Sequence, residues 1–555
     1  MDSSRPDPGD NPTNDPAPSG TRRPHIPSPR TPHPAESDVP AVAGVSAGDG
    51  VPVTEAPPDS EAPPDTDPTR TAQAEEERYW KAGRLEPMPI RKLPKAPPSI
   101  HILGPTVFLV ALGVGMGESY MWPRLVLVFG PEIRWLFLIG VSLQAVVMLE
   151  MSRYAMATGE SIFYGAARVF KPLMWFFFVT AILVYIWPGH LSAGASAFEK
   201  VTGVPWQITA VAGMLLVGVV FTLAKVIYNL LENVLSICIG LLVVGTSVVA
   251  AMVGNLSDLT STVTGMFAFG YLPDEAMTAA WFPIIVGSIA FAGPSGMQQM
   301  WYTLHLRDKG AGMGAHIPQI RGLRHAGDQE AMPSRGFMFD TSDPEEMEKW
   351  RGWRRWVSFD AMVLFWGITM LVTVSFTVLA QSAARFDPQV AELIRAGDRD
   401  ASLDAMAGAF SAAGSPVLGT VFFLFIALIG INATLGLFDS FSRGQADMTY
   451  NFVPGAKKMG MAKLYGMFLW GLIAFGIVIL LFGPADGPAA ILDVLAFLSA
   501  FAMGAYCVVL LLVNNLTLPR PIRPGIVSNA LIAFAALFYL GALFFSLFAF
   551  GVVVG

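Results

Sequence analysis

The chain has 555 residues, of which 53% are hydrophobic and only 14% are charged. Soluble domains carry about 25% charged residues, so this composition excludes an ordinary soluble protein. The net charge of −7 says little about partners, because the charges are segregated along the chain. The two cysteines, Cys238 and Cys507, each lie in an apolar run, which argues against a disulfide framework or a cysteine-ligated metal site.

Residues 1–98 hold 22 of the 42 prolines together with many Ser, Asp, Glu and Ala residues. Such a segment cannot bury enough apolar surface to offset chain entropy, so we expect a disordered Pro-rich cytoplasmic tail. A semi-extended polyproline linker or a docking tail is the alternative. The stretch Glu75 to Lys95 leads into the first apolar segment, and its six basic residues suit a cytoplasmic membrane surface.

The rest of the chain, residues 99–555, contains apolar segments of about 20 residues, the length of helix that crosses a bilayer. We count eleven, at 103–129, 132–157, 172–189, 206–225, 231–253, 281–305, 356–382, 416–442, 462–482, 488–514 and 526–550. Lipid offers no hydrogen-bond partner to the backbone, so these segments must be helices. The sequence predicts an all-α polytopic protein of the plasma (cytoplasmic) membrane.

Basic residues predict the orientation. The flank before the first segment and the loops on its side carry 25 Lys and Arg residues, whereas the opposite side carries six. The positive-inside rule therefore places the amino terminus in the cytoplasm and the carboxyl terminus outside. The longest cytoplasmic loop runs from Arg307 to Arg355, and the outer region from Arg385 to Ala413 is expected to be a solvated loop or a short amphipathic helix.

Two segments are interrupted near their centres. The first contains Gly113, Gly115 and Gly117 followed by Glu118, and the sixth contains Ala-Gly-Pro-Ser-Gly at 292–296. Glycine and proline both destabilise a helix interior. Two broken helices in corresponding positions are typical of inverted-repeat transporters, with repeats here at 103–253 and 281–514 and an extra helix at 526–550. Packing glycines and tolerated proline kinks are the alternative.

Glu118 makes the first break a functional candidate, because an ionisable side chain at bilayer depth is costly unless it faces a cavity or a partner. A neutral carboxylic acid that is hydrogen-bonded within the bundle is the other interpretation. With Gly115, Gly117 and the carbonyl groups of Ala290 to Gly293, it would form one cation site, supported by Ser295 and Gln298.

Other polar residues lie inside the predicted spans. Glu150 and Arg153 share a helix face and suggest a salt bridge or inner gate. Asn432 and Asp439 are seven residues apart and suggest a proton or gating path, or interhelical hydrogen bonding. Asp360, near a membrane edge, is expected to be solvated, and His305 is the histidine expected within a span, near its cytoplasmic end.

The sequence resembles the natural resistance-associated macrophage protein (Nramp) family of proton-coupled divalent-metal transporters, which share the inverted-repeat fold of the amino-acid transporters. The features that resemble it are Gly104-Pro105, the break after eleven residues, Thr158-Gly159-Glu160, and the run of Gly117-Glu118-Ser119 and Trp122-Pro123-Arg124, together with Arg307-Asp308-Lys309-Gly310 and Gly312-Met313-Gly314. The motifs within residues 117–124 and 307–314 resemble a divergent branch of the family most closely. The resemblance covers about residues 100 to 550.

This chain departs from the family at its metal ligands. The family's Asp-Pro-Gly-Asn falls on Gly115, Met116, Gly117 and Glu118, so the aspartate is absent. At the second break, we match the family's proline to Pro294. Its carbonyl-donating alanine then falls on Ala290, its methionine on Gly293 and its histidine on Ser295. Without the thioether, a harder or more hydrated ion is expected.

The predicted function is therefore a secondary transporter, not an enzyme, that moves a divalent cation such as Mn, Mg or Fe, coupled to protons. An ion-coupled transporter of an organic solute such as an amino acid is the alternative, since helix amides at the breaks could bind a carboxylate. No Walker-type phosphate loop, His-Glu-x-x-His or Gly-x-Ser-x-Gly motif occurs. No tightly bound cofactor and no nucleic-acid partner are expected; the partners are the lipid bilayer, the cation and protons.

The topology is directly testable. Eleven spans with a cytoplasmic amino terminus place a reporter fused after Lys225 in the cytoplasm and one fused after Gly551 outside. Fusions that report the same side would contradict this arrangement.

Overall fold

The computed structural model describes residues 78–97, 115–224, 227–320, 323–328, 330, 332–482 and 487–550. These residues belong to a compact unit that spans Ala72–Gly555. Most of the predicted tail, residues 1–77, lies outside the described part, and so does the upstream part of the first apolar segment, residues 103–114.

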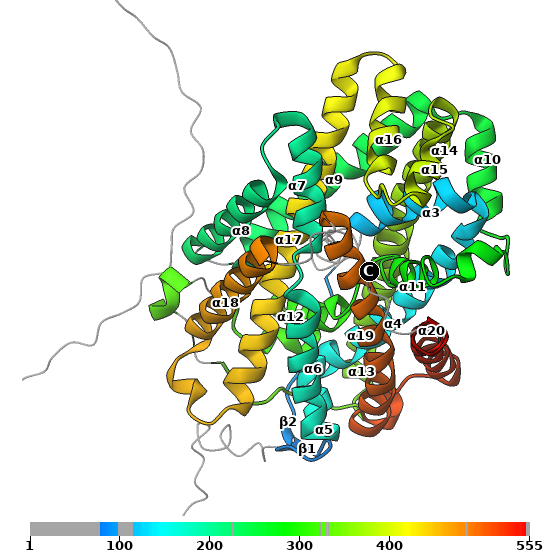
Figure 1. Ribbon diagram of the computed structural model, residues 1–555. Coiled ribbons are helices and arrows are strands. Elements are labelled where there is room, and N and C mark those ends of the chain that lie inside the picture. The colour runs from blue at the N-terminus through cyan, green and yellow to red at the C-terminus, as the bar shows by residue number, and fades with distance from the viewer. Residues whose placement is uncertain are drawn as a thin grey trace, which may run out of the picture. The chain divides into compact units, whose positions relative to one another are not determined.

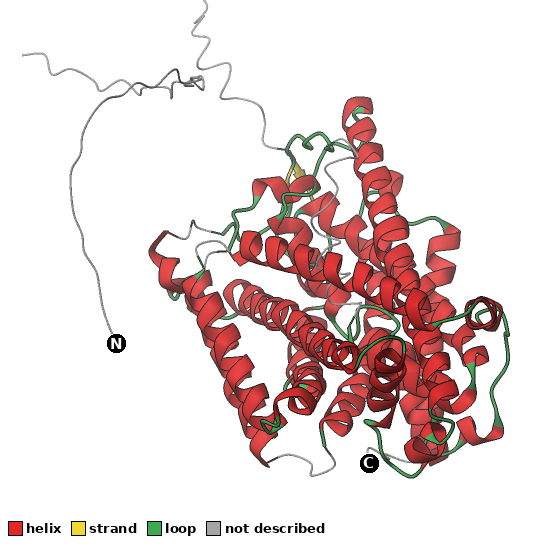
Figure 2. Cartoon of the chain, turned by 90° about the horizontal axis from the view of Figure 1, so that it is seen from above, coloured by secondary structure: helices red, strands yellow, loops and turns green. Residues whose placement is uncertain are grey.

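Helices make up nearly all of the described chain, as Figure 2 shows. The helical elements up to residue 265 are η2 (Gly117–Met121), α3 (Trp122–Phe129), η3 (Pro131–Arg134), α4 (Trp135–Thr158), α5 (Ile162–Val169), α6 (Lys171–Tyr185), α7 (Gly189–Thr202), α8 (Trp206–Leu223), α9 (Ile227–Val253) and α10 (Leu256–Gly265). The predicted helical class is therefore correct.

The later elements follow the same pattern. They are η4 (Asp274–Met277), α11 (Phe282–Ala290), α12 (Gln298–Asp308), η5 (Gly312–His316), η6 (Leu323–Asp328), α13 (Pro344–Phe359), η7 (Asp360–Gly367), α14 (Ile368–Phe386), α15 (Val390–Arg395), α16 (Ala401–Ala412), α17 (Pro416–Phe452), η8 (Ala456–Lys458), α18 (Met461–Phe482), α19 (Pro488–Thr517), η9 (Arg520–Ile522) and α20 (Ile526–Phe550).

Eight stretches of the described residues are long and apolar enough to cross a membrane. They are Pro131–Thr158, Lys171–Thr202, Trp206–Leu223, Pro344–Phe386, Pro416–Phe452, Met461–Phe482, Pro488–Thr517 and Ile526–Phe550. Apolar side chains also cover outward faces: Leu216, Phe475 and Leu537 are each more than 60% exposed. Such surfaces are stable in lipid and not in water, so the chain is an integral membrane protein.

Three of the eleven predicted segments are not among these eight. The segment 103–129 begins outside the described residues, and 231–253 corresponds to α9. The segment 281–305 is divided into α11 and α12 by the non-helical residues 291–297. The count of eleven spans and the two inverted repeats therefore stay predictions.

Several predicted boundaries are wrong. The third span does not end at 189: α6 and α7 continue to Thr202 with an interruption at Pro188, because the small polar residues after Pro188 lower the hydropathy on which the prediction depended. The helix that contains the seventh span begins at Pro344, because the charged helix α13 runs directly into the apolar segment. The eighth extends to Phe452.

Two polar regions differ from expectation as well. Asp360, expected to be solvated, is fully buried and accepts a hydrogen bond from the Tyr302 hydroxyl at 3.1 Å. The outer region expected to be a loop or one short helix contains two helices, α15 and α16, and α16 packs against α14 and α17. Burial of apolar side chains such as Met406 explains why this region is folded.

The helices that carry the two breaks lie against long, continuous helices. In Figure 1, α11 lies near α19, and the two helices are in contact; α3, which follows the first break, packs against α14. Helix α12 packs against α4 and α17. The interrupted segments thus pack against continuous helices. These contacts fix the position of the non-helical backbone at the breaks.

Residues 78–97 form a strap across one end of this bundle, next to α5 (Figure 1). The strap contains the antiparallel strands β1 (Tyr79–Trp80) and β2 (Met88–Pro89). The Trp80 indole donates to the Thr517 carbonyl at 3.0 Å, and the Trp353 indole of α13 donates to the Pro94 carbonyl at 2.8 Å. The strap therefore belongs to the folded unit, and the predicted tail boundary at residue 98 is wrong.

A buried ion pair fastens the strap. Arg168 of α5 lies 2.6 Å from the Glu160 carboxylate and also donates to the carbonyl groups of Ala82 and Glu86. Burial opposes the charge of Arg168, but Glu160 outweighs that effect, so the pKa of Arg168 lies above its usual value. Both side chains are almost fully buried, and each depends on the other for compensation.

We expect Arg168→Met to lower the free energy of unfolding by about 3–5 kcal/mol, because it leaves Glu160 as an unpaired buried charge. Thermal unfolding of the purified protein measures the loss.

Deletion of residues 1–75 leaves the strap intact and should change neither melting temperature nor transport.

The matched control is Lys200→Met, which breaks an exposed ion pair with Asp404. Exposed pairs contribute only about 0–1 kcal/mol, so this variant should melt close to the wild type. Equal losses in Arg168→Met and Lys200→Met would contradict the structural role of the buried pair.

Candidate functional site

The two breaks meet at Gly117. A Cβ atom on Gly117 would lie 2.0 Å from the Phe291 carbonyl oxygen, so the backbone of the first break touches the backbone of the second. Gly117 also begins the π-helical turn η2, and such single turns are frequent at functional sites. The two breaks, which are far apart in the sequence, are therefore one feature in space.

Glu118 lies in this turn and is only 1% exposed. Its Oε2 atom accepts a hydrogen bond from the Gly115 N–H at 3.0 Å. Its Oε1 atom is buried and has no hydrogen-bond partner among the described residues. The carboxylate is thus held at one oxygen and leaves the other available, which is the arrangement expected of a ligand group.

The backbone carbonyl groups expected to be free at the first break are not free. The Gly115 carbonyl accepts hydrogen bonds from the backbone N–H and the hydroxyl of Ser119, at 3.2 and 2.8 Å. The Gly117 carbonyl accepts the backbone N–H of Trp122. The chain resumes a helix at once, as a π turn, and so satisfies these two oxygens itself; a role for Gly115 and Gly117 in binding stays a prediction.

The second break is held open by its own residues and by neighbours. Gly293 and Gly296 have φ values of 131° and 55°, which side-chain-bearing residues rarely adopt. Pro294 has no N–H to donate to the Ala290 carbonyl, which instead accepts the Gln144 amide of α4 at 3.3 Å. The Ala290 carbonyl therefore has a side-chain donor in place of a helical one, and its role as a cation ligand stays a prediction.

Ser295 and Gln298, expected to support the cargo, bind each other. The Ser295 N–H donates to the Gln298 Oε1 atom at 3.1 Å, and the Gln298 amide donates to the Ser295 hydroxyl at 3.2 Å. This reciprocal pair ties the loop of the second break to the first residue of α12. The Tyr185 hydroxyl completes the support, since it accepts the Met297 N–H and donates to the Ser295 carbonyl. A direct role in binding stays a prediction for both residues.

His190 is a candidate that sequence reasoning missed. It is 3% exposed, neither ring nitrogen has a hydrogen-bond partner among the described residues, and its ring stacks on Phe291 with centroids 5.3 Å apart. It also borders a cavity of about 20 Å³, room for one water molecule. The available signal was Pro188-Gly189, which marks an interruption immediately before it.

Arg134 is a second missed residue. It begins the helical run into α4, is fully buried, and donates to the Thr373 carbonyl and hydroxyl at 2.9 and 2.8 Å. It forms no ion pair with any described residue, yet its charge interacts with that of Glu118. The site therefore pairs one negative group with a nearby positive group, which weakens the field that a bound cation would meet.

Metal-binding capacity here is limited. The described residues contain no group of three or more His, Cys, Asp or Glu side chains placed to hold a metal ion. Glu118 supplies an oxygen atom and His190 a nitrogen atom next to the breaks. The Met116 methyl group and the His190 carbonyl both lie near Gly430. A metal ion bound here would need backbone carbonyl groups or water to complete its coordination.

Glu150 and Arg153 form the expected ion pair, with Nε to Oε2 at 2.5 Å. Arg354 of α13 adds a second contact at 3.4 Å, and Arg153 donates to the Ile522 carbonyl. The cluster joins α4, α13 and the turn before α20. Its role as an inner gate stays a prediction.

Asp439 belongs to a buried network that the sequence did not reveal. It pairs with Arg443 at 2.9 Å and accepts the Tyr465 hydroxyl at 3.0 Å, and Arg443 also pairs with Asp308 of α12. His305 hydrogen-bonds Ser440 at 2.8 Å beside it. Asn432, predicted with Asp439, is buried two turns away on α17.

Comparisons with known proteins show the fold. A solved structure of the manganese transporter of Eremococcus coleocola, bound to an aromatic bis-isothiourea compound, covers 82% of this chain and 88% of its own, with a TM-score of 0.53 and 10% identity. A single-residue variant of that transporter covers 83% and 91%, with a TM-score of 0.55 and 12% identity. No family model and no curated protein sequence matches. The chain therefore has the fold of this transporter.

We expect Gly117→Ala to disrupt the contact between the breaks, because its Cβ would overlap a backbone oxygen. Overpacking costs about 1–3 kcal/mol, so the melting temperature should fall and transport should be lost. Gly471→Ala in α18 is the control, since nothing lies within 4 Å of its Cβ. Equal behaviour of the two variants would contradict the close approach.

Proposed function

We propose that this chain is a secondary active transporter that moves a divalent metal cation by alternating access around the contact between the two breaks, coupled to protons. The observation that carries the proposal is Glu118, a buried carboxylate at that contact whose Oε1 atom has no hydrogen-bond partner among the described residues. Burial of a charge is costly unless an ion or a partner compensates it. A cation delivered to Oε1 would provide that compensation.

The donor chemistry suits a weakly held, partly hydrated ion. Glu118 supplies one negative charge, and Arg134 offsets part of it. His190, whose ring stacks on Phe291 of the second break, offers an imidazole nitrogen. Carboxylate, imidazole and water together suit Mn²⁺ or Fe²⁺, and Mg²⁺ would be held by the carboxylate and its own water shell.

The ion-paired clusters at one end of the bundle supply candidate gates. Alternating access requires that one side of the site close while the other opens. Arg354 pairs with Glu150 and joins α13 to α4, and Arg443 pairs with Asp308 and joins α17 to α12. We infer that these pairs separate when the site opens to the cytoplasm, with Asp439 on the proton path.

The organic-solute alternative has one observation in its favour. Arg134 and Glu118 place opposite charges close enough to interact, and no cluster of three metal ligands lies in the described part of the chain. A zwitterion such as an amino acid carries the complementary pair of charges. Under this alternative, the ammonium group would face Glu118 and the carboxylate would face Arg134.

Glu118→Gln tests the proposal, because it keeps the side-chain shape and removes the charge. We expect it to abolish both the rise in melting temperature caused by divalent metals and metal uptake, while the protein folds as well as the wild type. Glu392→Gln, at an exposed side chain, is the matched control and should behave as wild type.

Normal metal uptake by Glu118→Gln would contradict the site. A wild type that is stabilised by amino acids and by no divalent metal would instead favour the organic-solute transporter. His190→Ala adds a second readout: if the imidazole contributes, affinity for Mn²⁺ should fall more than affinity for Mg²⁺, since imidazole binds the transition metal better.

A further inference from the structure

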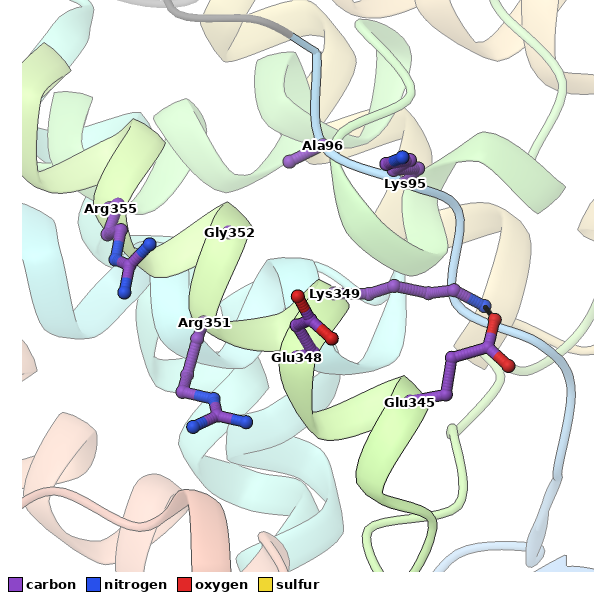
Figure 3. A pocket seen from close by; sticks show the side chains of 8 residues that line it. All are labelled: Lys95, Ala96, Glu345, Glu348, Lys349, Arg351, Gly352 and Arg355. Atoms are coloured by element: carbon purple, nitrogen blue, oxygen red, sulfur yellow. Dashed lines mark ion pairs between the residues drawn. The ribbon is translucent and has the colours of Figure 1, made fainter.

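A charged cavity lies where helix α13 meets the strap. It has a volume of about 470 Å³ and is lined by Lys95, Ala96, Glu345, Glu348, Lys349, Arg351, Gly352 and Arg355. Four of these side chains are basic and two are acidic, which gives the lining a net charge of +2. Figure 3 shows the strap passing beside α13, with Arg351 and Arg355 on successive turns of the helix.

Three of the four basic groups are not neutralised. Lys349 pairs with Glu345 and Glu346, at 2.9 and 2.8 Å. Within the described part of the chain, Lys95, Arg351 and Arg355 form no ion pair, and all three are exposed. The cavity thus presents uncompensated cations to whatever surrounds it, and an anion is the complementary ligand.

The position of the cavity on the helix identifies the anion. Arg351, Arg355 and Phe359 follow one another at four-residue intervals, and Met362 and Val363 continue the same face. Phe359, Met362 and Val363 are each 45–49% exposed, so this face changes from basic to apolar within three turns. This arrangement matches an anionic lipid. The acyl chains would lie along the apolar part of the face, and the headgroup would lie beside the basic residues.

We propose that this cavity binds the headgroup of an anionic phospholipid, with Arg351, Arg355 and Lys95 on its phosphate and the acyl chains along Phe359, Met362 and Val363. Contacts from both the strap and α13 would then make the lipid a tie between them. Gly352 and Ala96 already touch there, since a Cβ on Gly352 would lie 3.4 Å from that of Ala96.

Thermal unfolding of the delipidated full-length protein tests the proposal. Phosphatidylglycerol added to the micelles should raise the melting temperature of the wild type, whereas phosphatidylcholine should not. The double variant Arg351→Gln/Arg355→Gln should lose most of that rise and melt like the wild type without lipid. The matched control, Lys457→Gln/Lys458→Gln, removes two basic residues that do not line the cavity and should keep the rise.

Three results would overturn the proposal. Equal stabilisation by inorganic phosphate alone would identify a site for a soluble anion. Equal stabilisation by phosphatidylcholine would remove any role for the headgroup charge. Loss of the effect in the Lys457→Gln/Lys458→Gln control would show that general surface charge, and not this cavity, attracts the lipid.

Discussion

A carboxylate at bilayer depth must be compensated, and the centre of this protein is arranged around that requirement. Glu118 receives one backbone N–H, from Gly115, and the field of the buried Arg134, while its second oxygen has no hydrogen-bond partner in the part of the chain that the structure describes. Removal of a charge from water costs several kcal/mol, so this incomplete compensation is stable only if a further group completes it. A transported ion or an ammonium group would do so, and this is the physical basis of the proposed function.

The backbone at the two breaks keeps its hydrogen bonds although the helices are interrupted. A break exposes polar groups that lipid cannot satisfy, and nearby groups of the protein bind them instead. The π-helical turn η2 returns the first break to a helix, Tyr185 and Gln144 hydrogen-bond the second break, and Ser295 hydrogen-bonds Gln298 at the start of α12. Gly117 removes the side chain that would separate the two. The site is therefore rigidly supported although its backbone is irregular.

Local features were predictable from the sequence, and tertiary ones were not. Apolar length located most spans, and Gly293-Pro294 and Glu118 marked the breaks, because these signals act within one helix. His190 escaped notice because it follows a proline that ended the apolar run. Arg134 escaped notice because it was counted among the basic residues of the outer side, although it lies within the predicted span 132–157. The pairing of Arg443 with Asp308, from α17 to α12, and the attachment of the strap depend on packing that no local pattern encodes.

The account depends most on the claim that the contact between the breaks is a cation site. Uptake into proteoliposomes that contain the purified protein and an internal pH indicator measures cargo and coupling together. The account predicts that Mn²⁺ or Mg²⁺ accumulates and that protons cross the membrane with it. Accumulation of an amino acid, with no divalent cation transported under any pH gradient, would contradict it.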